Sequence, residues 1–150
     1  MKLRRRARMI ALQALYEIDS VNHDSAIVLE ERLAAHPLSS EGADFARALL
    51  NGVLAHLPQL DDMIHTHAPE WPLEQMSIID RNVLRIAIYE FAINGDTPVK
   101  VAINEAVELA KIFGSDSSRR FVNGVLGTLA TQIALPSSRQ AAARSRARRS

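Results

Sequence analysis

Basic residues are concentrated at the two ends of this 150-residue sequence. Five of them lie within the first eight residues, which contain no acid: Lys2, Arg4, Arg5, Arg6 and Arg8. Five more lie in residues 139–150, again without an acid: Arg139, Arg144, Arg146, Arg148 and Arg149. The rest of the chain sets 8 bases against all 17 acids, a formal charge of −9, although the whole chain carries +1. This asymmetry indicates a polyanion held by the ends, or a basic partner held by the acidic body.

A second basic element, Ser115–Asn123, places two arginines and an aromatic ring at the start of an expected helix. A helix amino terminus presents free N–H groups and the positive end of the helix dipole, which together favour phosphate. Arg119 and Arg120 add positive charge, and the ring of Phe121 is suited to stacking on a nucleic-acid base. Alternatively, Phe121 is part of the hydrophobic core, because it lies at the edge of the apolar face of its helix. Both interpretations are open at this point.

The sequence lacks the residue patterns of several catalytic and metal-binding sites. It has no cysteine, which excludes disulfides, thiolate zinc sites and a cysteine nucleophile. Its five histidines match no zinc-ligand spacing, and no glycine-rich phosphate loop is present. We therefore expect a protein that is not an enzyme and that needs no cofactor or metal. No apolar run approaches the roughly 18 residues of a membrane span, so we expect a soluble protein without a membrane partner. We also expect it in the cytoplasm.

Helical periodicity runs through nearly the whole chain, and no convincing alternating strand pattern occurs. We therefore predict an all-α protein of about seven helices in two small packed bundles. The expected helices cover residues 7–20, 25–36, 40–57, 58–68, 76–94, 99–113 and 117–135. The prolines of Ala68–Pro72 cannot continue a helix, so we place the two halves at about 1–68 and 73–136. Residues 137–150 have the composition of a disordered basic tail.

Three features inside the expected helices have structural explanations. Gly124 and Gly127 resemble the GxxG motif of a KH domain, but they lie in an apolar helical row, where close helix packing explains small residues better. Glu105 and Glu108 fit the solvated face of their helix. Asp80 interrupts an otherwise apolar helix, which favours either an external partner for its carboxylate or stabilisation by the helix dipole.

The first helix raises a question about its own arginines. If it extended back to Arg4, then Arg4 and Arg8 would continue the stripe of Leu12 and Leu15, which belongs in the core. An unpaired buried charge costs several kcal/mol, so we expect the segment before about Arg8 to overhang the bundle or to be unfolded. A free cationic arm of this kind suits a nucleic-acid backbone. The alternatives are a solubilising end and local pairing with acids of the body.

Three segments together resemble the NusB family of bacterial transcription antitermination factors. They are RRRARMIALQALYEID, DRNVLRIAIYEF and TPVKVAINEAVELAKIFGSDSSRRFVNGVLGTLA, and the resemblance extends over roughly residues 2–133. It implies an all-helical, non-enzymatic protein that binds boxA RNA together with a small ribosomal subunit protein, NusE. It also implies that this pair joins RNA polymerase and other Nus factors and favours elongation, chiefly on ribosomal RNA operons. Some members of the family form homodimers that cover the RNA-binding arm, and the sequence leaves this choice open.

The resemblance also implies roles for individual residues. RNA contacts are expected from Lys2, Arg4, Arg5, Arg6, Arg8, Arg119, Arg120 and Phe121, and NusE contacts from Tyr16 and Asp80. Ser117 takes the place of an acidic residue that tempers RNA affinity in some members, which predicts somewhat tighter RNA binding here. Two alternatives remain: the RNA-binding helical domain of a ribosomal RNA cytosine methyltransferase, and a helical adaptor that binds no RNA.

Overall fold

The computed structural model describes residues 2–134, and every regular element in this range is helical. The seven α-helices are α1 (Leu3–Val21), α2 (Ser25–Ala35), α3 (Ser40–Ala55), α4 (Leu57–His67), α5 (Ile78–Ile88), α6 (Val99–Phe113) and α7 (Ser118–Ala134). Two short helical turns complete the set, η1 (Leu73–Gln75) and η2 (Tyr89–Asn94). The prediction of an all-α protein with about seven helices is confirmed. The basic tail, with its five arginines, lies outside the described residues.

Local signals in the sequence account for where several helices begin and end. The side chains of Asp24, Ser39 and Ser77 accept a hydrogen bond from a backbone N–H in the first turn of α2, α3 and α5, respectively, as N-cap residues commonly do. Pro58 lies in the first turn of α4, where its missing N–H has no partner to lose. Gly95, with φ of 76°, ends η2 in the left-handed conformation that glycine adopts at little cost.

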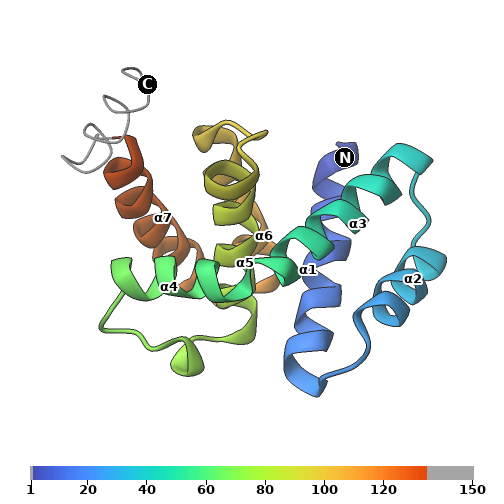
Figure 1. The fold of residues 1–150 in the computed structure, drawn as a ribbon, viewed down its shortest axis with the longest axis horizontal. Helices are drawn as coiled ribbons and strands as arrows, with labels where there is room; N and C mark the ends of the chain where they lie inside the picture. Colours follow the sequence, from blue (N-terminus) through green and yellow to red (C-terminus); the bar gives the residue numbers. More distant parts are fainter. Residues whose placement is uncertain (1, 135–150) are drawn as a thin grey trace, which may run out of the picture.

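The helices form two groups around a shared centre (Figure 1). In one group α1 packs against α2 and α3, and in the other α5 packs against α4, α6 and α7. α4 also packs against α7, so the change of group occurs near His56, between α3 and α4. The division at the proline-rich segment 68–72 does not follow this packing, because α4 buries its apolar face in the second group. α1 also packs against α5, and the buried residues of both groups form one continuous core.

The helix expected over residues 76–94 is central, but it is not one regular helix. It begins at Ile78, and from Tyr89 onward its turn widens into the π-helical segment η2. Such widened turns are rare, and they change the direction in which the following side chains point. Here the turn contains Glu90, whose side chain is buried. None of the helices in residues 2–134 is both long enough and apolar enough to cross a membrane.

Close packing between helices occurs at Gly52, and not at Gly124 and Gly127, where the sequence pattern predicts it. A Cβ atom added to Gly124 or Gly127 would meet nothing within 4 Å, so the packing explanation for this pair is wrong. A Cβ atom added to Gly52, on α3, would instead overlap the ring of Tyr89. The close approach therefore occurs between α3 and η2, two segments whose contact the local sequence pattern does not reveal.

Candidate nucleic-acid interface

The amino-terminal arginines belong to a helix, and the expected free arm before Arg8 is absent, since α1 begins at Leu3. Arg8 is only 4% exposed. Its Nη2 and Nε donate to the two carboxylate oxygens of Glu90 at 2.7 and 2.9 Å. Thr97 also donates its hydroxyl to Glu90, at 3.0 Å. The expectation of an overhanging segment is wrong because Arg8 has a buried partner, which allows the helix to carry its charge into the core.

Arg5 is held in the same way by α6. Its Nε and Nη2 each donate to one carboxylate oxygen of Glu105, both at 2.9 Å. The hydrogen bonds from Arg5 lower the pKa of Glu105 below its usual value, and those same bonds raise the pKa of Arg5. Glu105 is therefore buried and paired, which corrects its placement on the solvated face of the helix. Arg5 and Arg8 are therefore paired with acids of the body, which is one of the alternatives that the sequence left open.

The remaining amino-terminal bases, Lys2, Arg4 and Arg6, are exposed. The guanidinium carbon of Arg4 lies 4.9 Å from the centre of the Phe45 ring, an attractive cation–π geometry that leaves the hydrogen-bond donors of Arg4 free for a ligand. Helical spacing explains why some bases are paired and others are exposed, because Arg5 and Arg8 lie on the side of α1 that faces η2 and α6. The structure thus separates the five bases into two groups: Arg5 and Arg8 are paired with acids, and Arg8 is also buried, whereas Lys2, Arg4 and Arg6 are open to solvent.

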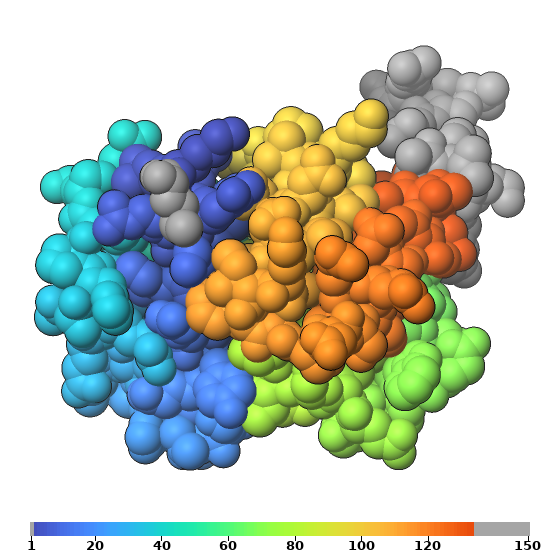
Figure 2. Space-filling view, turned by 180° about the vertical axis from the view of Figure 1, so that it is seen from behind, coloured from blue at the N-terminus to red at the C-terminus, as the bar shows by residue number. Residues whose placement is uncertain are grey.

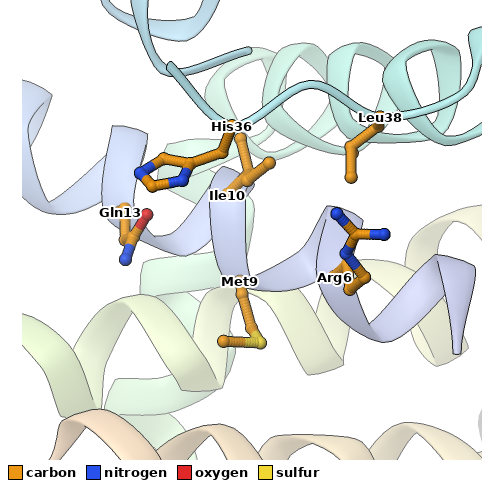
Figure 3. A pocket seen from close by; sticks show the side chains of 6 residues that line it. All are labelled: Arg6, Met9, Ile10, Gln13, His36 and Leu38. Atoms are coloured by element: carbon orange, nitrogen blue, oxygen red, sulfur yellow. The ribbon is translucent and has the colours of Figure 1, made fainter. Parts of the chain in front are cut away.

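One side of α1 is accessible from its basic start towards Tyr16. Arg6, Met9 and Gln13 follow one another on this side, and with Ile10, His36 and Leu38 they line a shallow cavity of about 220 Å³. Figure 3 shows the Gln13 amide close to the His36 ring, and Arg6 close to Leu38. The cavity has a cationic group at one end, an amide and an imidazole at the other, and an apolar floor. This combination suits a phosphate with an adjoining apolar or aromatic group.

The start of α7 provides the second basic element. Ser118 is fully buried, and its Oγ accepts a hydrogen bond from the backbone N–H of Ser115 at 2.9 Å, which fixes the turn between α6 and α7. Arg119 and Arg120 follow on the exposed side, and neither forms an ion pair within residues 2–134. Figure 2 shows the start of α1 in dark blue beside the α6–α7 region in yellow and orange, so both basic elements lie on one face.

Phe121 contributes to the core, as one of the two interpretations of the sequence expects, and part of its side chain is accessible. It is half-buried and packs against the core. Its ring also meets that of Trp71 edge to face, with ring centres 5.9 Å apart and an angle of 73° between the planes. Trp71 itself is 54% exposed. Sequence reasoning missed Trp71, although the sequence contains only this one tryptophan and it lies in the proline-rich segment.

The two residues expected to contact a protein partner lie on different helices. Tyr16, on α1, is 43% exposed. Asp80 lies in the first turn of α5, where its backbone N–H donates to the capping hydroxyl of Ser77 at 3.0 Å. A negative side chain at this position is favoured by the helix dipole, so part of the stabilisation of Asp80 is local.

A network of ion pairs ties together the helices that carry these two residues. Asp19, one turn after Tyr16, accepts hydrogen bonds from Arg81 at 2.7 and 2.8 Å and from Asn82 at 2.9 Å. Burial raises the pKa of Asp19, but the hydrogen bonds from Arg81 and Asn82 outweigh this effect, so the pKa lies below its usual value. Arg85 links Asp19 to Asp61 on α4. Arg81 and Arg85 lie one turn apart in the otherwise apolar helix α5. This spacing is the sequence signal that could have indicated the network.

No cluster of acidic and histidine side chains within residues 2–134 has an arrangement that could hold a metal ion. Asp61, which the helical spacing aligns with His65, accepts hydrogen bonds from Arg85 at 2.8 and 3.0 Å. The exposed arginines at the starts of α1 and α7 can pair with phosphates, and the rings of Trp71 and Phe121 can stack on bases.

Comparison of this sequence with known proteins finds matches over most of the chain. A sequence model described as the NusB family matches residues 5–131. The transcription antitermination protein NusB of Dehalococcoides mccartyi (strain CBDB1) is 52% identical over 131 residues, which are 87% of this chain and 92% of that protein. The corresponding protein of Bacillus subtilis (strain 168) is 47% identical over 131 residues, 87% of this chain and 96% of that protein.

Solved structures share the fold. T. maritima NusB is 36% identical, with a TM-score of 0.79, and the match covers 85% of this chain and 90% of that chain. A second structure contains the antitermination factors NusB and NusE in complex with double-stranded RNA. The matching chain of that complex is 22% identical, with a TM-score of 0.81, covering 88% of this chain and 98% of the other. At this identity the similarity establishes the fold.

Proposed function

The chain belongs to the NusB family, and we propose that it is a transcription antitermination factor that binds RNA together with the ribosomal protein NusE. The observation that carries the proposal is one face on which α1 and α7 present exposed cations. Paired surface charges are already neutralised, whereas unpaired cations on one face attract a polyanion. The relative solved with NusE and double-stranded RNA supports the same choice of partners.

The RNA contacts divide between two basic elements. Lys2, Arg4 and Arg6 would pair with phosphates at the start of α1, and Arg119 and Arg120 would do so at the start of α7. Phe121 would stack on a base. Arg5 and Arg8, which the sequence also suggested as RNA contacts, would act as positioning residues, because their pairs with Glu105 and Glu90 hold α1 in place.

The NusE contacts would come from Tyr16 and Asp80. An acidic body is complementary to a basic ribosomal protein, and charges at the rim of an interface mainly steer association. The finer role follows the family: the RNA would be the boxA element of a ribosomal RNA transcript. The complex would act in the bacterial cytoplasm with RNA polymerase and other Nus factors to promote processive elongation.

Fluorescence anisotropy of labelled RNA tests this function. A boxA-like single strand and a scrambled strand of equal length are each titrated with the protein, with and without purified NusE. We expect tighter binding to the boxA-like strand, and a preference that grows when NusE is present. Equal, weak binding to both strands with no effect of NusE would favour a helical adaptor instead.

A further inference from the structure

A second cavity lies between the Trp71–Asp80 segment and the start of α7. It measures about 320 Å³, and its walls include Trp71, Met76, Asp80, Arg120 and Phe121. We propose that this cavity holds one unpaired base of the bound RNA, stacked against Trp71 and Phe121. The inference rests on the proposed RNA-binding function and adds to it a specific base site and Trp71 as a binding residue.

The aromatic walls favour a flat ligand. Trp71 and Phe121 meet edge to face, so their rings form two walls of a corner and do not cover one another. Trp71 leaves 54% of its surface exposed, which is a large apolar area to leave in water. Stacking on such rings accepts any of the four bases, because every base has a π-face. Met76 is buried and supplies an apolar part of the cavity wall.

The charged residues distinguish a base from a phosphate. The carboxylate of Asp80 lines the cavity, and its Oδ1 is buried without a hydrogen-bond partner among the described residues. A carboxylate repels a phosphate but accepts hydrogen bonds from the N–H groups of a base edge. Arg120 lines the same cavity and is exposed, so it can neutralise the phosphate next to an inserted base.

The cavity adjoins the face that carries the exposed bases of α1 and α7. The cavity walls join Asp80 to residues at the start of α7, and in Figure 2 a yellow-green segment touches the orange part of the chain on the face that also carries α1. An RNA strand held by α1 and by Arg119 therefore passes the mouth of the cavity. Asp80 lies where the RNA surface would meet the NusE surface. An aromatic side chain of a protein partner is the competing occupant, and the test below separates the two.

The single tryptophan makes the site directly observable. We would titrate the 150-residue protein with unlabelled single-stranded boxA-like RNA in the absence of NusE and follow Trp71 fluorescence. Stacking of a base should quench it along the same curve that anisotropy gives for binding. Trp71→Ala should weaken RNA binding at least about five-fold, the lower end for one base–aromatic stack. Trp71→Phe should retain most of the affinity.

Ile27→Ala is the matched control, since Ile27 is also an exposed apolar side chain, at 58%, but lies on α2. It should change RNA affinity less than two-fold. Circular dichroism of each variant confirms that the helices are intact. A set of RNA strands, each lacking the base at a different position, locates the base that enters the cavity. At one position, removal of the base should weaken RNA binding by the wild type but not by Trp71→Ala.

The outcomes separate this inference from the proposed function. If RNA binds with unchanged Trp71 fluorescence, and Trp71→Ala binds like Ile27→Ala, then the base site is wrong while RNA binding stands. If no single-stranded RNA binds, with or without NusE, both proposals fail. If NusE alone quenches Trp71, and Trp71→Ala weakens NusE but not RNA, then the cavity is a protein-docking site and the base is excluded.

Discussion

Arg8 and Glu90 are joined inside the protein by three hydrogen bonds of 2.7, 2.9 and 3.2 Å, although 82 residues separate them in the chain. Their side chains are 5% and 3% exposed, respectively. The pair connects the basic start of α1 to the widened turn η2. It therefore holds the side of α1 that carries Arg8 against η2.

Removal of one partner of this pair should strongly destabilise the fold. Glu90→Ala leaves the Arg8 guanidinium buried without its acceptor, and breaking such a pair costs about 3–5 kcal/mol. Urea denaturation followed by circular dichroism measures the free energy of unfolding. Glu30→Ala is the control, because Glu30 pairs with Arg47 at the surface, and it should have a much smaller effect. Equal effects of the two substitutions would show that Arg8 does not depend on Glu90.

The exposed bases of α1 should set the salt dependence of RNA binding. Replacement of Lys2, Arg4 and Arg6 together by alanine should lower the slope of log affinity against log salt by about 0.7 for each single-strand phosphate that is no longer neutralised. Arg47→Ala, on α3, removes a cation that is already paired with Glu30 and Asp44, and it should leave the slope unchanged. An unchanged slope in the triple variant would remove the start of α1 from the RNA-binding surface.

Acid should weaken the fold through Glu105 and Asp19. Both carboxyls have a pKa below the usual values of 4.5 and 3.8 in the folded protein. Their contribution to stability is therefore complete above these values and is lost as the pH falls below them, through the folded-state pKa. The free energy of unfolding, measured at several pH values from 7 to 3, should decline below about pH 4.5. Glu105→Gln should make this decline shallower, and an identical decline would exclude Glu105 as a contributor.

Two glycines in helices should respond to alanine with opposite signs. Gly52→Ala forces a methyl group into the Tyr89 ring and should cost about 1–3 kcal/mol, as overpacking does. Gly124→Ala adds a methyl group in open space and should stabilise the protein by up to about 1 kcal/mol through helix propensity. Thermal denaturation reports both changes. Tyr89→Leu should partly rescue Gly52→Ala, and a lack of coupling would place the strain elsewhere.

Tyr16 should matter for NusE and not for RNA alone. Tyr16→Asp places a charge on an exposed aromatic position, which should weaken NusE binding about ten-fold or more if the ring is a central contact. Calorimetry with NusE and anisotropy with RNA alone separate the two affinities. Ile27→Asp, on α2, is the control for a charge at an exposed apolar site. Loss of RNA affinity with intact NusE binding would reverse the assignment.

The sequence by itself determined the helical class, the approximate bounds of most helices, the hydrophobic stripes of α1 and α5, and the family to which the chain belongs. These follow from local periodicity, capping residues and motifs, all of which are readable over short segments. It also singled out Phe121 and the exposed arginines of α7.

Tertiary structure alone decided which of the five amino-terminal bases are open to a ligand. Arg5 and Arg8 are paired because Glu105 and Glu90, which lie 100 and 82 residues further along the chain, respectively, are brought against α1 when α6 and η2 pack. The same packing places Trp71 beside Phe121 and leaves Gly124 in open space. Long-range ion pairs change the free energy of burying a charge, and no local pattern contains the position of the distant partner.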